Sequence, residues 1–236
     1  MRLRNLPRLH MVLMLLVLLA VPRLALAGPS VIFSVDFAGF AGGAVLSWLN
    51  SKGFLPKQDA TNARKVVYFN RGNDLALETK SKAFGLLLNE ADVSGYSKIR
   101  IQWGVDVFPP GASYEKGVRA EAVMVYVFFG KERISSGSLL IPDSPYFIGL
   151  FLCESEKLGE PFTGRYFRAG GRFICVNHPP VGELITTEYP IADAFKRTFG
   201  KSDVPDISGF GIAIDTNNAR GNAIARAFVH KIEFIK

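Results

Sequence analysis

KIRIQWGVDV at residues 98–107 and EAVMVYVFF at residues 121–129 are the two segments that decide the fold class. In the first, apolar side chains alternate with polar or small ones, so one face of an extended strand enters the core and the other carries polar groups. The second is apolar on both faces, which is typical of a strand in the middle of a sheet with both faces largely covered. If the two pair as antiparallel neighbours through residues 109–118, Asp106 and Glu121 lie near one another.

Short segments of the same kind recur along the chain, and turn residues separate them. They lie at 31–37, 65–69, 74–78, 84–88, 146–153, 172–176, 209–214 and 225–234. Helical candidates are limited to 44–51 and 191–199, and Gly200 is a stop signal for the second. The pattern predicts an all-β fold, an antiparallel β-sandwich with one or two short peripheral helices, rather than alternating strands and helices.

The first 27 residues have the pattern of a secretory signal peptide. A segment with three arginines precedes an apolar run at 11–21, and Ala25-Leu26-Ala27 is the small-x-small pattern that a signal peptidase reads. The alternative is a retained anchor helix, but the apolar run is shorter than the ~20 residues needed to span a bilayer. We therefore expect cleavage after Ala27, a single domain at 28–236, and a periplasmic or secreted protein without stable membrane insertion.

Charge and motifs exclude several classes of function. The whole chain carries a net charge of +7, but four arginines and no acidic residue lie in the first 27 residues. Removing these four from the 28 basic residues leaves 24 against 21 acidic ones, a net charge of +3. The basicity is thus largely a targeting feature, and we expect no nucleic-acid partner. No glycine-rich phosphate or dinucleotide motif, serine-nucleophile elbow or Cys/His zinc spacing is present, so we expect no cofactor.

Cys153 and Cys175 are the only two cysteines in the sequence. They lie in apolar segments suited to neighbouring strands, and two thiols of an exported protein meet an oxidising compartment. We predict a disulfide, which contributes ~3 kcal/mol by restricting the unfolded chain. The alternative is a pair of buried thiols that pack as small apolar groups.

Asp106 and Glu121 are the best candidates for a catalytic carboxylate pair. Glycoside hydrolysis divides its acid and its base or nucleophile roles between two such groups. The alternative, which we favour, is an ion pair between Glu121 and Arg100 or Arg119 at the surface of the sheet.

Residues 215–218, Asp-Thr-Asn-Asn, gather oxygen donors in a short loop after a strand. Asp215, Asn217 and Asn218 are weak candidates for calcium ligands, although the spacing is not that of an EF-hand loop. We favour a structural turn, because Asp and Asn side chains bond to their own backbone in turns.

The polar face of the strand at 98–107 is the predicted ligand site. Its directional hydrogen-bonding groups suit a hydroxyl-rich ligand, and tyrosines add apolar contact area. The predicted ligand-binding residues are Arg100, Gln102, Asp106, Glu121 and Tyr146. Further candidates for a stacking platform are Tyr114 and Tyr166, with Arg165 and Arg168 beside them.

A family resemblance is carried by four segments: IRIQW at 99–103, RAEAVMVYVFF at 119–129, ADAFKRTFG at 192–200 and GIAIDTNN at 211–218. In these segments the chain resembles the bacterial family known as domain of unknown function 3047, from about Trp48 to the C-terminus. The resemblance implies a jelly-roll or galactose-binding-like β-sandwich similar to carbohydrate-binding modules, and a location in the cell envelope. It implies no reaction.

Together these observations predict an exported envelope protein that acts as a non-catalytic binding module for a glycan or another envelope ligand. One alternative is a structural or assembly partner protein of the envelope. Another is a polysaccharide-acting hydrolase or lyase that uses Asp106 and Glu121.

Overall fold

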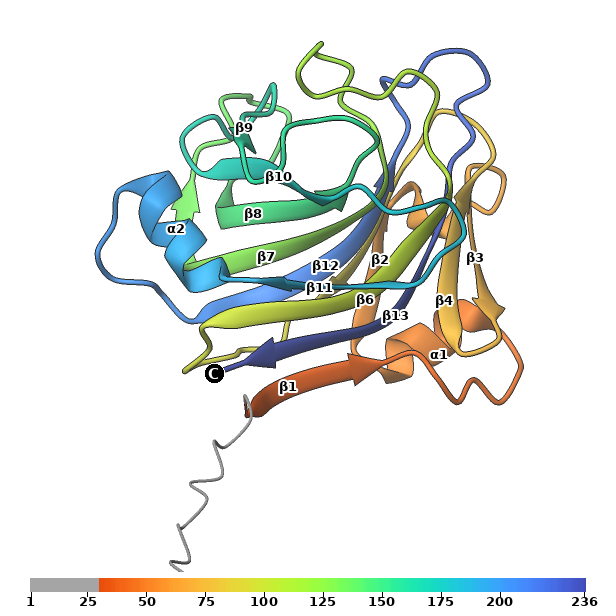
Figure 1. Cartoon of the computed structure of the whole chain (residues 1–236), viewed down its shortest axis with the longest axis horizontal. Helices are drawn as coiled ribbons and strands as arrows, with labels where there is room; N and C mark the ends of the chain where they lie inside the picture. The colour runs from red at the N-terminus through yellow and green to blue at the C-terminus, as the bar shows by residue number, and fades with distance from the viewer. Residues whose placement is uncertain (1–29) are drawn as a thin grey trace, which may run out of the picture.

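The computed structural model describes residues 30–236, so the predicted signal peptide and its cleavage site lie outside the described residues. Two β-sheets pack face to face, and two short helices lie at the periphery (Figure 1). The fold is therefore the all-β sandwich that the sequence predicts. The helices are α1 (Val45–Ser51) and α2 (Ile191–Phe199), with one 3-10 turn, η1 (Asp59–Thr61).

The six-stranded sheet is organised around the last strand of the chain. Its order is β11 (Ile185–Tyr189), β6 (Lys98–Val107), β13 (Arg226–Ile235), β4 (Asp74–Thr79) and β3 (Val66–Arg71). The first strand, β1 (Val31–Asp36), pairs with residues 231–235 of β13, while β4 pairs with residues 226–229. The start of β1 and the C-terminus therefore lie side by side (Figure 1).

The seven-stranded sheet contains the longest strand. Its order is β2 (Phe54–Gln58), β5 (Phe84–Asn89), β12 (Ile207–Asp215), β7 (Glu121–Ile134), β8 (Ser144–Leu152), β10 (Gly171–Asn177) and β9 (Pro161–Phe162). All pairs in this sheet are antiparallel except β8 and β10, which are parallel. The sandwich is therefore antiparallel with one parallel exception.

The expected pairing of the two deciding strands is wrong. β6 belongs to the six-stranded sheet and β7 to the seven-stranded sheet, so residues 108–120 cross from one sheet to the other. The apolar faces of the two strands meet across the core instead of lying edge to edge, with Trp103 and Val125 fully buried. Trp103 also donates its indole N–H to Thr187 Oγ1 at 2.9 Å, which satisfies the one polar atom of this side chain.

The predicted disulfide and the end of the second helix are confirmed. Cys153 and Cys175 are bonded, with Cα atoms 5.9 Å apart, at the ends of the neighbouring strands β8 and β10. Gly200 ends α2 in the left-handed conformation at φ 66°, which glycine adopts without a steric penalty. None of the helices within residues 30–236 is long and apolar enough to cross a membrane.

Candidate functional site

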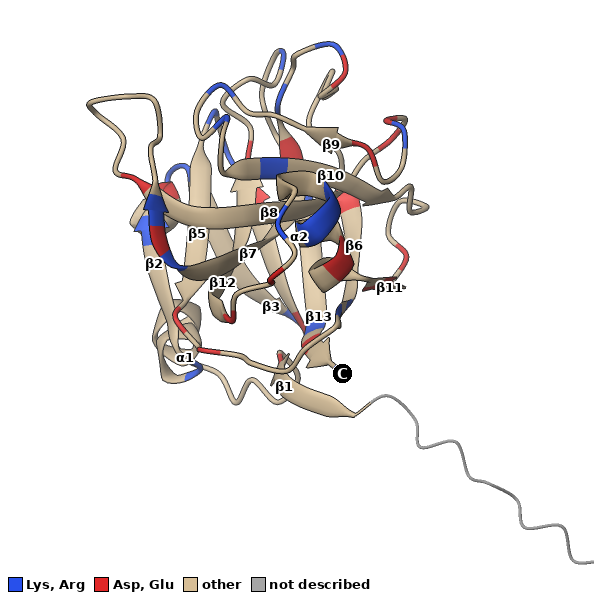
Figure 2. Ribbon diagram, turned by 90° about the vertical axis from the view of Figure 1, so that its left-hand side faces the viewer, with Lys and Arg blue, Asp and Glu red and all other residues tan. Residues whose placement is uncertain are grey.

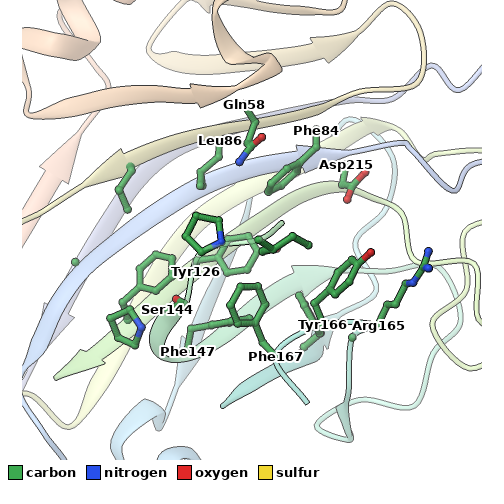
Figure 3. Close-up of a pocket in the computed structure, with 18 of the residues that line it drawn as sticks. Gln58, Phe84, Leu86, Tyr126, Ser144, Phe147, Arg165, Tyr166, Phe167 and Asp215 are labelled. Atoms are coloured by element: carbon green, nitrogen blue, oxygen red, sulfur yellow. The ribbon is translucent and has the colours of Figure 1, made fainter. Parts of the chain in front are cut away.

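A groove with a volume of about 1090 Å³ runs over the outer face of the seven-stranded sheet (Figure 3). It exists because strand β7 is apolar on both faces: Val125 and Val127 enter the core, while Tyr126 and Phe128 point outward and line the groove. The sequence predicts that both faces of β7 are largely covered, but the structure leaves the rings of Tyr126 and Phe128 partly exposed on the outer face. Figure 2 shows the middle strands β7 and β12 with charged residues only toward their ends, and β8 contains none.

Aromatic and aliphatic side chains form the floor and one wall of the groove. Tyr126 and Phe147 pack with ring centroids 5.5 Å apart, and Phe147 packs equally close to Phe167 on the wall. Phe84 and Leu86 lie on the opposite side (Figure 3).

Two glycines on the outer face of the sheet accept neighbouring side chains. A Cβ atom at Gly149 would lie 2.4 Å from the Met124 sulfur, and one at Gly211 would lie 2.8 Å from the Leu86 side chain. Both distances are too short for a side chain at either position, so Met124 and Leu86 fold down over the sheet. Of these residues, Leu86 lines the groove.

A carboxylate pair closes one end of the groove. Asp215 on β12 and Glu121 on β7 are cross-strand partners, and both line the groove. Glu121 is only 3% exposed and accepts a hydrogen bond from the Tyr114 hydroxyl at 2.8 Å. Asp215 is half-buried and accepts the backbone N–H of Asn217 at 2.8 Å.

These surroundings make both carboxyl groups hold their protons more tightly than usual. Burial, followed by the nearby Asp215 charge, raises the pKa of Glu121 well above its ordinary value, although the Tyr114 hydrogen bond opposes the shift. Burial, with a smaller contribution from Asp59, raises the pKa of Asp215 to about 6. Glu121 therefore holds its proton more tightly than an ordinary glutamic acid, whereas Asp215, with a pKa of about 6, is largely ionised at pH 7.

Only one of the two predicted catalytic carboxylates lies in the groove. Asp106 lies in the other sheet and makes an ion pair with Arg71 at 3.4 Å, so it cannot act together with Glu121. The expected ion pair of Glu121 with Arg100 or Arg119 is also wrong, because Glu121 is buried against Tyr114, and the ion pairs within residues 30–236 do not include it. Strand pairing gives Glu121 a different carboxylate neighbour, Asp215.

The other predicted ligand-binding residues lie away from the groove. Arg100 and Gln102 face outward from the six-stranded sheet, where Arg100 binds the carboxylates of Glu188 and Glu233. Tyr146 points to the opposite face of its strand and packs against Phe199 of α2, with ring centroids 4.9 Å apart. The platform candidates Tyr114, Tyr166 and Arg165 do line the groove, whereas Arg168 is not among its lining residues.

The loop at residues 215–218 has the hydrogen bonds of a turn. In addition to the Asp215 to Asn217 bond, Asn218 donates its side-chain N–H to the Arg119 carbonyl at 3.1 Å. Calcium binding by this loop stays an untested alternative. Among residues 30–236, one group has metal-ligand geometry, Cys153, Cys175 and His178, but the two sulfurs are joined to each other in the disulfide.

Comparisons with known proteins give similarity of fold only. No family profile and no curated protein matches the sequence. One similar structure is the xyloglucanase domain of NopAA, a type three effector from Sinorhizobium fredii, at 10% identity over 88% of this chain and 100% of that one, TM-score 0.42. Another is endoglucanase 3 of Trichoderma harzianum, at 9% identity over 88% and 97%, TM-score 0.42. A third is a xylan-binding module from Roseburia intestinalis, at 12% identity over 78% and 96%, TM-score 0.32.

Proposed function

We propose that the mature chain is an exported protein that binds a glycan in the groove of the seven-stranded sheet. The observation that carries this proposal is the composition of the groove, in which partly exposed aromatic rings lie beside a cluster of polar side chains. Sugar rings present an apolar face and a rim of hydroxyl groups, so they need both kinds of surface at once.

The size of the groove favours a chain of sugars over a single one. Its volume of about 1090 Å³ lies just above the ~300–1,000 Å³ range of small-molecule sites. Hydrogen-bonding groups are placed along it, with Glu121 and Asp215 at one end and Gln58 and Ser144 at other points of the lining (Figure 3). A polymer segment can therefore place its ring faces on Tyr126 and its hydroxyls on these polar groups.

Export and an envelope location complete the proposal. They rest on the signal-peptide pattern of residues 1–27 and on the resemblance to the family of domain of unknown function 3047. The disulfide is compatible with them, because such bonds persist in oxidising compartments. The alternative role, as a structural or assembly partner, predicts that the protein has no affinity for glycans. A titration with glycans therefore distinguishes the two roles.

The test is a calorimetric titration of the mature domain with soluble hexasaccharides of glucose, xylose, mannose and galactose. Binding should weaken about 10-fold in Tyr166→Ala, because an aromatic contact contributes ~0.5–1.5 kcal/mol. Tyr166 is suitable because it stands on the wall of the groove, on the loop before β10, and is only partly buried.

The matched control is the double variant Arg100→Gln/Gln102→Ala on the opposite sheet. Arg100 and Gln102 are partly exposed, as Tyr166 is, but they do not line the groove. The affinity of this variant for the hexasaccharides should therefore stay at the wild-type value. If no hexasaccharide binds the folded domain, glycan binding is refuted and the scaffold role gains support. If the control loses affinity and Tyr166→Ala keeps it, the ligand lies on the other sheet.

A further inference from the structure

Glu121 and Asp215 meet on neighbouring strands at the end of the groove. They are cross-strand partners, and both side chains face the groove side of the sheet. The strand register is irregular just before this pair, between Ala213 and Asp215, yet the two side chains stay close enough for the charge of Asp215 to act on Glu121. The two carboxyl groups therefore approach each other over a surface on which a bound chain would lie.

The two carboxyl groups have different environments. Glu121 is buried, and burial favours the protonated acid more strongly than the hydrogen bond from the Tyr114 hydroxyl favours the carboxylate. Asp215 is half-buried and accepts a backbone N–H, a bond that favours the carboxylate over the acid. One group is thus prepared to give a proton and the other to act as an anion, which is the division of roles that paired-carboxylate chemistry needs.

One buried polar atom beside the carboxylate pair lacks a protein partner within residues 30–236. The Nε atom of Arg119 is buried without any hydrogen-bond partner in the part of the chain that the structure describes, and Arg119 lines the groove. The Tyr126 hydroxyl lies close enough to Glu121 and Asp215 for their charges to raise its pKa further, after burial. An unpaired buried N–H costs free energy, so a ligand that accepts from it would be favoured here.

We propose that Glu121 and Asp215 are the general acid and the nucleophile of a glycoside hydrolase site in this groove. This inference rests on the proposed glycan binding and extends it from binding to cleavage. The assignment takes the retaining route, because paired positions on adjacent strands place the two carboxyl groups near each other, and retaining enzymes need the closer pair, ~5–5.5 Å against ~6.5–9.5 Å for inverting ones.

The reaction balances in two steps. In the first, the Asp215 carboxylate attacks the anomeric carbon while Glu121 transfers its proton to the leaving glycosidic oxygen, so one C–O bond breaks and an ester to Asp215 forms. In the second, the Glu121 carboxylate takes a proton from water, and the water oxygen bonds to the anomeric carbon as Asp215 leaves. One water is consumed, and both residues return to their starting states.

Further charged and titratable side chains surround the carboxylate pair. Asp59 on η1 adds negative charge near Asp215, and Lys65 binds Asp59 at 2.9 Å and partly offsets that charge. Tyr114 and Tyr126 face Glu121 from the groove side.

The experiment measures release of reducing ends from the hexasaccharides that the groove binds. Glu121→Gln should lower turnover by 10²–10⁴-fold on these substrates, because general acid catalysis contributes ~10²–10⁴-fold. The same variant should lose much less in the first step with 2,4-dinitrophenyl glycosides, whose leaving group needs no proton. Asp215→Asn should abolish turnover of both kinds of substrate, since the asparagine amide cannot form the covalent ester with the sugar.

Glu156→Gln is the matched control. Glu156 is also 3% exposed and contacts the same tyrosine, accepting the Tyr114 backbone N–H at 2.9 Å, but it does not line the groove. It should keep wild-type turnover. Hexasaccharides that bind the wild type but are never cleaved would overturn the hydrolase inference and leave the proposed binding intact. Equal losses on both substrate classes in Glu121→Gln would also overturn the assignment of Glu121 as the acid.

Discussion

Replacing Asp215 by asparagine should stabilise the protein at neutral pH and leave it unchanged in acid. The side chain of Asp215 holds its proton more tightly in the folded state, because burial first, and the charge of Asp59 as a further cause, raises its pKa from 3.8 to about 6. The folded state therefore binds more protons than the unfolded state between pH 4 and 6, and stability falls as pH rises through that window. Asparagine carries no charge at any pH, so the variant does not lose this stability.

The size of the effect follows from the shift. A pKa difference of about 2 corresponds to about 3 kcal/mol between the two protonation states. Because Asp215 is half-buried, solvent screens part of this difference, and about 1–2 kcal/mol should remain above pH 7. The bond to the Asn217 N–H survives, because the asparagine side-chain oxygen is also an acceptor.

The assay is urea unfolding of wild type and variant at pH 4, 5, 6, 7 and 8, followed by the fluorescence of the buried Trp103. Asp36→Asn is the matched control, since Asp36 makes the same kind of bond to the N–H two residues on, at 2.7 Å, but does not line the groove. Its free energy of unfolding at pH 8 should not exceed that of the wild type. A variant no more stable than wild type at pH 8, or equally stabilised at pH 4 and pH 8, would refute the reasoning.

Three further predictions concern the core and its links. Trp103→Phe should cost about 2–4 kcal/mol in urea unfolding, since it leaves a cavity and removes the donor that Thr187 accepts; a loss under 0.5 kcal/mol would contradict this. Replacing Cys153 and Cys175 by alanine should cost about 3 kcal/mol, because the bond closes a loop with a sequence separation of 22; an unchanged melting temperature would count against it. Gly104→Ala should cost more than 2 kcal/mol, because the added Cβ would lie 2.3 Å from a backbone oxygen; a wild-type unfolding curve would disprove this.

Local sequence pattern predicted most of the elements. Alternation with a period of two places β6 at residues 98–107, as observed, and helical spacing followed by Gly200 places α2 at 191–199. The three strands that the sequence did not indicate, β2, β9 and β11, all lie at sheet edges. An edge strand needs fewer apolar residues and tolerates Pro56, so its pattern resembles that of a loop.

The candidate site was predictable only in part. Glu121 was singled out as a carboxylate on an apolar strand, and Tyr114, Tyr166 and Arg165 as parts of a stacking platform, and all four line the groove. Asp215 was considered only for calcium, because a turn of Asp and Asn residues has the donors that calcium prefers. Nothing in the local sequence relates Asp215 to Glu121, which precedes it by 94 positions.

The sequence alone therefore determined which residues are extended and which of their faces is apolar, because these depend on neighbours one to four positions away. Only the tertiary structure decided which strands become partners. The alternation in β6 and the apolar run in β7 are equally satisfied when the strands pair side by side or face each other across the core, since both arrangements bury apolar side chains of each strand. The choice between them separates Asp106 from Glu121 and brings Asp215 to it, because strand pairing depends on contacts between residues distant in the chain.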